Sequence, residues 1–348
     1  MKHEGKLKIN KKYIFILGIV TTAIISTTIG ILIGDHLQEK NFRKYAKSIK
    51  NIREINDNKF VSPLIVSISA PATDIGIYTD IKEQIVTYLK KEESRGELED
   101  FSFYFKDLNT PFWFGVNEQE SFTPASLYKL PIAVAIYKQS EMEGGDLFLK
   151  KAVIYTQDID TINKNIPENN GTRLIVGNGY SVEELVKIML KESDNGAKNL
   201  LISVLDKKYI TELFGLLDIS MQNNQGYLVS SKSYALFLRL LYNASYLYVT
   251  HSEYILSLLT ISDFKEGLVA GVPNNVQIAH KFGTYTTTER GESSAVLHDC
   301  GIVYHTNHPY IICFMTKGKS IKYLFSIIAE VSKMVYYEQN SDGQFSDN

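Results

Sequence analysis

Three short polar strings constrain this chain most, because each occurs once and they follow one another in a fixed order. They are Ser126–Lys129, Ser193–Asn195 and His280–Thr284. A serine followed three residues later by a lysine is common by chance, so the first string alone predicts little. Followed by a Ser-Asp-Asn string and a lysine-glycine strand, however, it matches the parts of a serine acyl-transfer site. These parts are a nucleophile with a lysine, a polar relay and a lysine-glycine strand.

The first string has the chemistry of an activated serine. Ser126 and Lys129 lie three residues apart at an expected helix start, which places both side chains on one face. A lysine desolvated in a cleft loses basicity, so its neutral amine can accept the serine proton. The helix N-terminus adds backbone N–H groups beside a developing oxyanion. Taken alone, the same string is more typical of a helix-start serine and a surface lysine.

The second and third strings can supply the remaining groups. Ser193 can relay a proton to the leaving group and the Asn195 amide can bind a substrate carbonyl, although a polar Ser-Asp-Asn-Gly break is by default a turn. Lys281 can hold a substrate carboxylate, and Gly283 lets a substrate backbone approach the strand closely. The alternative for Lys281 is an edge-strand lysine that guards against aggregation.

The acidic charge of the chain body argues against one class of partner. Of the 348 residues, 44% are hydrophobic and 22% are charged, as in an ordinary globular protein. The net charge of −2 conceals 11 basic and three acidic residues within residues 1–53, which leaves 26 basic and 36 acidic residues elsewhere. Nucleic-acid binding calls for clustered Lys and Arg, so we expect no nucleic-acid partner.

The cysteines and the clustered histidines indicate neither a disulfide framework nor a metal site. Cys300 and Cys313 fall in an expected hairpin, where a disulfide would need direct cross-strand pairing, and we expect two small buried thiols. His298, His305 and His308 gather around the tip of that hairpin without a carboxylate or thiol pattern. We therefore expect surface histidines, no metal and no cofactor.

Residues 13–34 form a run of 22 uncharged, mostly apolar residues. As a helix the run would be about 33 Å long, close to the hydrocarbon thickness of a bilayer. It is too long for the apolar core of a cleaved signal peptide, so we expect an uncleaved transmembrane signal-anchor helix. The lysine-rich residues 1–12 favour a cytoplasmic N-terminus, and residues 35–74 would form a juxtamembrane stalk or linker. Basic residues also follow the run, so charge alone leaves the orientation open, and a buried core helix is the alternative.

The periodicity of the globular part indicates an α+β fold. Helical spacing begins near residue 79, and alternating aromatic and polar residues predict a hairpin over 101–107 and 112–116. A capping-box pattern opens another helix at Ser181–Glu184. Further helices are expected from Thr123 and over 232–241 and 320–337. Strands are expected over 277–285, 295–305 and 309–317. The tail over 338–348 is polar, and we expect it to be disordered. If early and late strands share one sheet, an antiparallel sheet built from both chain ends is flanked by helices, with a mostly helical middle subdomain.

On these strings the chain resembles the penicillin-recognising serine enzymes, nearest to the class A β-lactamase-like branch. The likeness covers roughly residues 75–337 and rests on Thr123–Pro131, Ser181–Leu201 and the AHKFGTY run before the last hairpin. It implies a β-lactamase/transpeptidase-like fold, and peptidoglycan peptides or β-lactams as ligands. The resemblance implies that Ser126 is the nucleophile, Lys129 its general base and Ser193 the proton shuttle. It also implies that the Asn195 amide binds the substrate and that Lys281 binds its carboxylate. Backbone N–H groups of Ser126 and Thr284 would form the oxyanion hole.

Two departures from the family pattern shape the expected function. Phe282 replaces a hydroxyl residue that usually helps to bind the substrate carboxylate. The glutamate that activates the deacylating water in class A enzymes has no counterpart, since no glutamate lies between Glu212 and Glu253. An acyl-enzyme should therefore form but hydrolyse slowly. We expect a membrane-anchored, extracytoplasmic serine hydrolase of the penicillin-binding type. The alternatives are a class A-like β-lactamase and a non-catalytic module that binds the cell wall.

Overall fold

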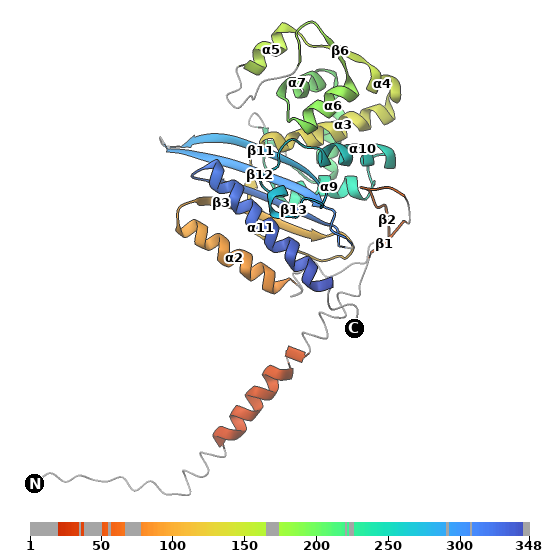
Figure 1. The fold of residues 1–348 in the computed structure, drawn as a ribbon. Coiled ribbons are helices and arrows are strands. Elements are labelled where there is room, and N and C mark those ends of the chain that lie inside the picture. Colours follow the sequence, from red (N-terminus) through yellow and green to blue (C-terminus); the bar gives the residue numbers. More distant parts are fainter. Residues whose placement is uncertain are drawn as a thin grey trace, which may run out of the picture. The chain divides into compact units, whose positions relative to one another are not determined.

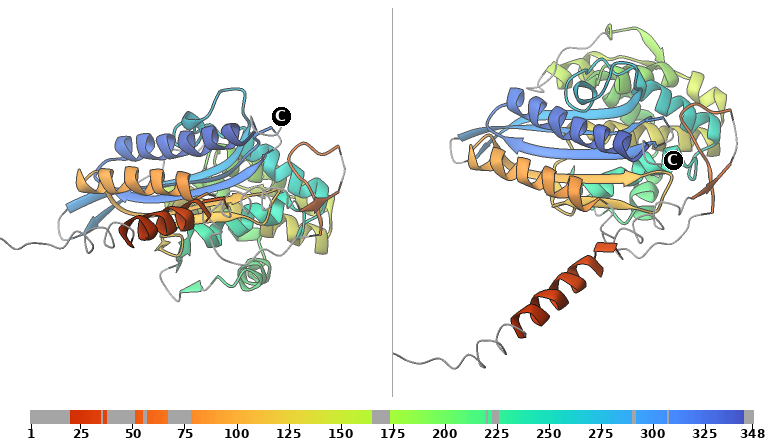
Figure 2. Two further views of the ribbon diagram at one scale, coloured as in Figure 1. Left: turned by 90° about the horizontal axis from the view of Figure 1, so that it is seen from below. Right: turned by 60° about the horizontal axis from the view of Figure 1, so that its bottom comes forward.

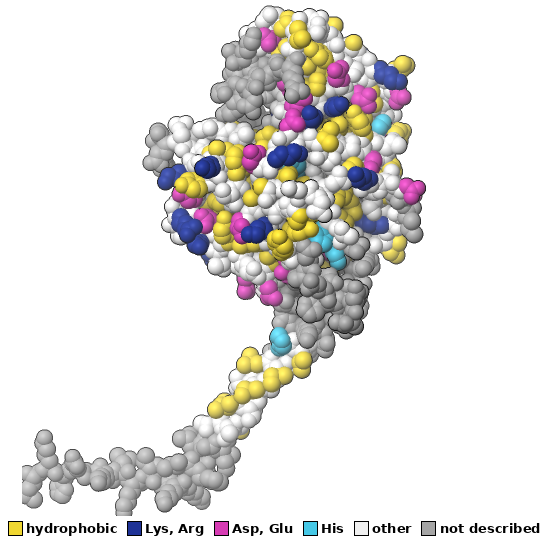
Figure 3. Space-filling view, viewed as in Figure 1, with side chains coloured by type: hydrophobic (Ala, Val, Ile, Leu, Met, Phe, Trp, Pro, Cys, Tyr) yellow, Lys and Arg dark blue, Asp and Glu magenta, His cyan; other side chains and the backbone are white. Residues whose placement is uncertain are grey.

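The computed structural model divides the chain into two units, Met1–Ile49 and Lys50–Asn348. It describes residues 20–34, 36–37, 51–54, 57–66, 78–164, 174–219, 221–222, 226–289, 292–306 and 308–343. In the first unit, residues 20–34 form a helix with exposed apolar side chains (Figure 3). Within the described ranges, no helix combines the length and apolarity needed to cross a membrane. The predicted signal-anchor is thus not supported there, and its residues 13–19 lie outside the described part.

The second unit is built on a five-stranded antiparallel sheet (Figure 1). The strand order is β11-β12-β13-β3-β4, so strands from the two ends of this unit lie side by side. At the junction, Phe105 of β3 is paired with Ile312 of β13. The bounds are β3 Leu98–Asp107, β4 Trp113–Val116, β11 Ile278–Glu289, β12 Glu292–Val303 and β13 Tyr310–Gly318. The predicted sheet, assembled from early and late strands, is confirmed.

Helices cover both faces of this sheet (Figure 2). The first and last helices of the unit, α2 (Thr79–Ser94) and α11 (Ile321–Gly343), pack against each other and against the sheet. On the other face, α9 (Ser231–Tyr242) packs against β3, β12 and β13. Because both faces are covered, β3 and β13 are buried along most of their length instead of alternating between buried and exposed residues.

The predicted helical middle lies between the two groups of strands. Its first long helix is almost wholly buried. At the predicted capping box, Ser181 Oγ accepts the Glu184 N–H bond, which confirms the predicted start of α6. The helical bounds are η1 Ala125–Tyr128, α3 Lys129–Met142, α4 Asp146–Lys150, α5 Gln157–Lys164, α6 Val182–Lys191, α7 Asn195–Val204, α8 Lys207–Leu216, α10 Val249–Thr260 and η2 Val269–Gly271. Short strand pairs accompany them: β5 (Ser121–Phe122) with β10 (Val229–Ser230), β6 (Ala152–Ile154) with β7 (Gly179–Ser181), and β8 (Met221–Gln222) with β9 (Gly226–Tyr227).

Part of the segment predicted to be a stalk belongs to the second unit. Strands β1 (Ile52–Arg53) and β2 (Leu64–Val66) pair with each other, and Phe60 and Val61 between them are only 7% and 3% exposed. The Glu253 carboxylate on α10 accepts backbone N–H bonds from this loop. The prediction of a linker through residue 74 is therefore wrong for residues 51–54 and 57–66, because apolar burial, the Glu253 carboxylate and hydrogen bonds of Arg53 and Ser62 hold them on the second unit.

The C-terminal helix also extends further than predicted. α11 continues to Gly343, so residues 338–343 of the predicted disordered tail are helical. Gln339 is only 3% exposed, since it continues the buried stripe that contains Val331 and Val335. Residues 344–348 lie outside the described part of the chain.

The two cysteines are joined in the middle of the sheet. Cys300 on β12 and Cys313 on β13 are direct cross-strand partners and form a disulfide. The expectation of two free thiols was wrong because it depended on a strand register that the sequence pattern does not specify to one residue.

Candidate active site

The first string folds as a tight turn that leads into a helix. Ser126 lies in the 3-10 turn η1, and Lys129 is the first residue of α3, 1% exposed. Ala125 before the serine has a positive φ of 50°, a conformation that costs free energy in a residue with a Cβ. The turn places Lys129 Nζ 3.1 Å from Ser126 Oγ, within hydrogen-bonding distance. The predicted pairing of serine and lysine is thus present.

Lys129 is a buried amine surrounded mainly by neutral groups. Besides Ser126 Oγ, its Nζ contacts Ser193 Oγ at 3.1 Å and donates to the Ser193 carbonyl oxygen. Burial, assisted by the positive charges of Lys281 and Lys198, lowers the pKa of Lys129 to about 6, and Asp194 opposes this only weakly. At neutral pH Lys129 is therefore largely a neutral amine, which can accept the proton of Ser126.

The second string connects two helices at the site. Ser193 has φ 58° between α6 and α7, and the buried Asp194 caps α7 by accepting the Ala197 N–H bond at 2.7 Å. This cap holds the serine in place, so that its Oγ bridges Lys129 and Lys281. Asn195, half-buried, is the first residue of α7. The Ser193–Asn195 string therefore forms the predicted turn and also places the Ser193 hydroxyl at the predicted relay position.

The third string lies on β11, as predicted. Lys281 is fully buried and donates to Ser193 Oγ and to the Phe282 carbonyl oxygen, each at 2.9 Å. Burial lowers the pKa of Lys281 to about 7, although the nearby Asp299 acts in the opposite direction. Lys281 therefore contacts the relay serine, Ser193, a role that the sequence did not predict.

Gly283 allows β11 to pass directly beside the nucleophile. A Cβ atom at this position would lie 2.9 Å from Ser126 N and 3.0 Å from Pro124 O, closer than real Cβ contacts come. Only glycine therefore permits this approach. Thr284 follows on the strand and is half-buried. The contact brings the expected oxyanion-hole segments, at Ser126 and after Gly283, against each other.

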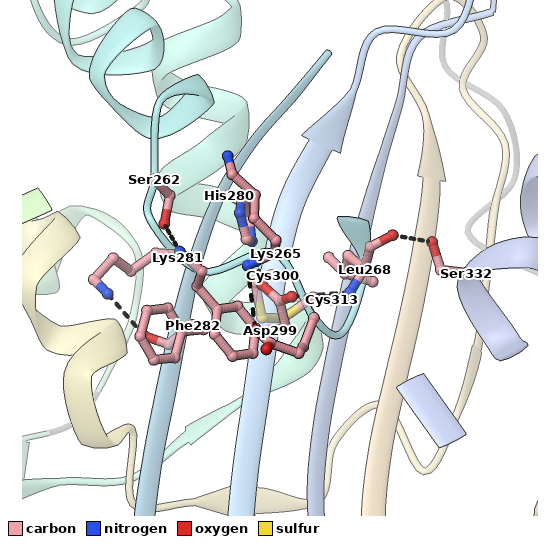
Figure 4. Close-up of polar contacts among 12 residues, drawn as sticks. Ser262, Lys265, Leu268, His280, Lys281, Phe282, Asp299, Cys300, Cys313 and Ser332 are labelled. Atoms are coloured by element: carbon pink, nitrogen blue, oxygen red, sulfur yellow. Dashed lines mark hydrogen bonds and ion pairs between the residues drawn. A yellow bond between two sulfur atoms is a disulfide. The ribbon is translucent and has the colours of Figure 1, made fainter. Parts of the chain in front are cut away.

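A buried hydrogen bond between His280 and Asp299, next to the third string, was not found from the sequence. His280 Nδ1 lies 2.8 Å from Asp299 Oδ1, with side chains only 1% and 0% exposed, and Asp299 Oδ2 accepts the Leu268 N–H bond at 3.0 Å (Figure 4). His280 belongs to the third string, but Asp299 becomes its partner only through the register of β11 and β12. That register pairs Phe282 directly with Asp299.

His298 occupies a different place from the one predicted. It is fully buried on β12, where Nδ1 accepts the Thr316 N–H bond and Nε2 donates to the Thr123 carbonyl oxygen. Burial lowers the pKa of His298 to about 4, so the ring is neutral and keeps this hydrogen-bonding pattern. The prediction of a surface histidine was wrong here, because the hairpin tip lies further along the chain, at His305 and His308.

The described part of the chain contains no cluster of three or more His, Cys, Asp or Glu side chains suited to a metal ion. Between α8 and α9 the described residues form β8, β9 and β10, and residues 220 and 223–225 lie outside them. The sequence of this connection holds no glutamate. The arrangement supplies a nucleophile, a neutral base and a relay hydroxyl, which together can carry out acyl transfer to Ser126.

Comparison with known proteins agrees with the fold. The model of the β-lactamase enzyme family matches residues 80–339, so the chain belongs to that family. Among solved structures, PBP-A is 22% identical with a TM-score of 0.63, and the match covers 76% of this chain and 97% of that one. An acyl-enzyme complex of a PBP-A mutant with penicillin G gives 23% identity, a TM-score of 0.62 and coverages of 76% and 97%. The TLA-1 extended-spectrum β-lactamase is 18% identical with a TM-score of 0.64, and the match covers 75% of this chain and 98% of that one. No curated protein matches the chain.

Proposed function

We propose that this chain is a membrane-anchored, extracytoplasmic acyl-transfer enzyme that forms an acyl-enzyme at Ser126 with peptidoglycan-type peptides or β-lactams. The observation that carries the proposal is the 3.1 Å contact between Lys129 Nζ and Ser126 Oγ, made by an amine whose pKa burial lowers to about 6. A neutral amine at this distance is a competent general base. The penicillin acyl-enzyme of a PBP-A mutant supports the same chemistry.

Acylation follows from the hydrogen bonds at the site. Ser126 Oγ attacks the carbonyl carbon of the ligand while its proton passes to Lys129 Nζ. Backbone N–H groups of Ser126 and Thr284 would receive the oxyanion. Ser193 Oγ, 3.1 Å from Lys129 Nζ, then gives its proton to the leaving nitrogen as the carbon–nitrogen bond breaks, and takes up the proton that Lys129 received from Ser126. Lys281, 2.9 Å from the same hydroxyl, holds it in position.

Release of the acyl group should be slow. The connection between α8 and α9 carries no glutamate to activate water, so the acyl-enzyme lacks the group that class A β-lactamases use. This favours an enzyme that holds its acyl group or transfers it to an amine, over an efficient β-lactamase.

The lifetime of the acyl-enzyme tests the proposal. The protein is treated with excess fluorescent penicillin, and the Ser126 peptide is followed by mass spectrometry. We expect one adduct that persists for minutes to hours and is absent from Ser126→Ala. Rapid turnover of a chromogenic cephalosporin would indicate a β-lactamase instead. No adduct on the folded protein would indicate a binding module.

Membrane attachment rests on the run of 22 uncharged residues at 13–34. Exposed apolar side chains such as Ile24, Ile31 and Leu32 in the helix over 20–34 are compatible with lipid contact. Cell fractionation tests this part separately: the full chain should remain in membranes after an alkaline carbonate wash, and external protease should digest the catalytic unit. Release by the wash would exclude an integral anchor.

A further inference from the structure

Two stacked phenylalanine rings lie beside the lysine of the third string. Phe282 follows Lys281 on β11, and its ring stacks on that of Phe264, with centroids 4.0 Å apart and planes at 13°. Phe264 also packs edge-on against Phe325 of α11, at 5.6 Å. Both phenylalanines of the stack are only partly buried, so they offer apolar surface to a ligand. This stack is held in place from behind by the last helix.

The neighbouring lysine is not open to a ligand carboxylate. Lys281 is 0% exposed and its donors are directed at Ser193 Oγ and the Phe282 carbonyl oxygen. Its Nζ also lies 4.3 Å from the centroid of the Phe282 ring. A carboxylate could reach this nitrogen only if the groups that bury it moved. Figure 4 shows Lys281 and Phe282 side by side on the strand.

A buried side chain with hydrogen-bonded oxygens already fills the region behind the stack. Asp299 is the cross-strand partner of Phe282 and is completely buried, held by His280 and the Leu268 N–H group. A carboxylate brought to Phe282 would lose water without gaining a hydroxyl donor there. An uncharged group would instead bury apolar area against the two rings.

We propose, resting on acyl transfer to Ser126, that Phe264 and Phe282 form an apolar subsite for the leaving group, and that the enzyme selects acyl donors with an uncharged, apolar leaving group over donors ending in a carboxylate. Among cell-wall peptides, this favours a scissile bond whose amine carries no adjacent carboxylate. Ser126 Oγ bonds to the acyl carbon, the bond to the leaving group breaks, and the serine proton ends on the departing atom.

A matched pair of esters tests this selection. Phenyl phenylacetylglycinate and its meta-carboxyphenyl counterpart have leaving phenols of similar acidity and deliver the same acyl group. Deacylation is therefore identical, and any difference arises at the leaving-group end. We expect the purified protein to be acylated at least about tenfold faster by the uncharged ester, normalised to alkaline hydrolysis. Phe282→Thr should reduce or reverse this ratio, whereas Phe282→Leu should retain it.

The outcomes separate this proposal from the proposed function. If neither ester nor penicillin acylates Ser126, acyl transfer itself is wrong. If both esters acylate Ser126 and the carboxylated one reacts equally fast or faster in the wild-type protein, only the apolar subsite is wrong. This comparison needs no variant, so it holds even if Phe282→Thr fails to fold. Phe264→Ala supplies a second variant, in which the preference should also fall.

Discussion

At the residue scale, the site is built around two buried lysine amines that both contact the Ser193 hydroxyl. Lys129 and Lys281 both contact Ser193 Oγ, at 3.1 and 2.9 Å. Burial lowers the pKa of each lysine, and their mutual repulsion contributes for Lys129. The three polar strings indicated these residues from the sequence. Asp299 and Phe264 were not identified, because no motif contains them and only strand register and loop packing bring them to the third string.

The lowered pKa of Lys129 predicts a trade between stability and activity. Between about 6 and the ordinary value of 10.5, the unfolded chain binds more protons at this lysine than the folded protein does. Stability of the wild-type protein should therefore rise with pH across this window. Lys129→Met should remove that contribution and unfold at higher denaturant concentration at pH 7, while acylation falls at least about 100-fold.

Denaturant unfolding at pH 7 and pH 9, with penicillin labelling in parallel, measures both effects. The exposed Lys90→Met variant is the matched control and should change neither. If Lys129→Met were no more stable than wild type at pH 7 and kept the same pH slope, the buried neutral amine would be the wrong description.

At the element scale, part of the segment that was expected to be a stalk packs onto the second unit. Helix periodicity and strand alternation predicted α2, α6, α9 and the late strands, because those signals are local. Residues 51–66 carry little such signal. Their docking depends on Glu253, whose oxygens accept N–H bonds from Lys59, Phe60 and Val61 at 3.0, 2.9 and 2.8 Å.

Removing that carboxylate should release the docked segment. Glu253→Ala leaves three backbone N–H groups without their acceptor, which should cost about 1–3 kcal/mol of local stability. Hydrogen exchange at residues 59–61 should accelerate strongly in Glu253→Ala and less in Glu253→Gln, which keeps one acceptor oxygen. Unchanged protection in Glu253→Ala would show that apolar burial and the remaining hydrogen bonds, such as that from Ser62 N–H to the Tyr242 carbonyl oxygen, hold the segment without the carboxylate.

At the scale of the whole molecule, the sheet joins segments that are distant in sequence, and a disulfide crosses its centre. Cys300 and Cys313, 13 residues apart, link β12 to β13 beside β3. Closing a loop of this size stabilises a fold by about 3 kcal/mol in the chain-entropy model. A protein secreted to an oxidising compartment would keep the bond.

Reduction should therefore weaken the entire second unit. Dithiothreitol should lower the midpoint of denaturant unfolding of the wild-type protein but leave the Cys300→Ala, Cys313→Ala double variant unchanged, because that variant has no bond to lose. The double variant should unfold near the reduced wild type. An equal shift in both proteins would mean that the reagent acts elsewhere.

Local patterns in the sequence were sufficient to predict the α+β class, most helices and strands of the second unit, and Ser126, Lys129, Ser193 and Lys281 as candidate site residues, because periodicity and motif spacing are local properties. The tertiary structure alone decided the disulfide, the burial of His298, the docking of residues 51–66 and the Phe264–Phe282 stack. Each of these depends on which atoms from distant segments come into contact. Such contacts follow from strand register and side-chain packing, which a local pattern of residues does not encode.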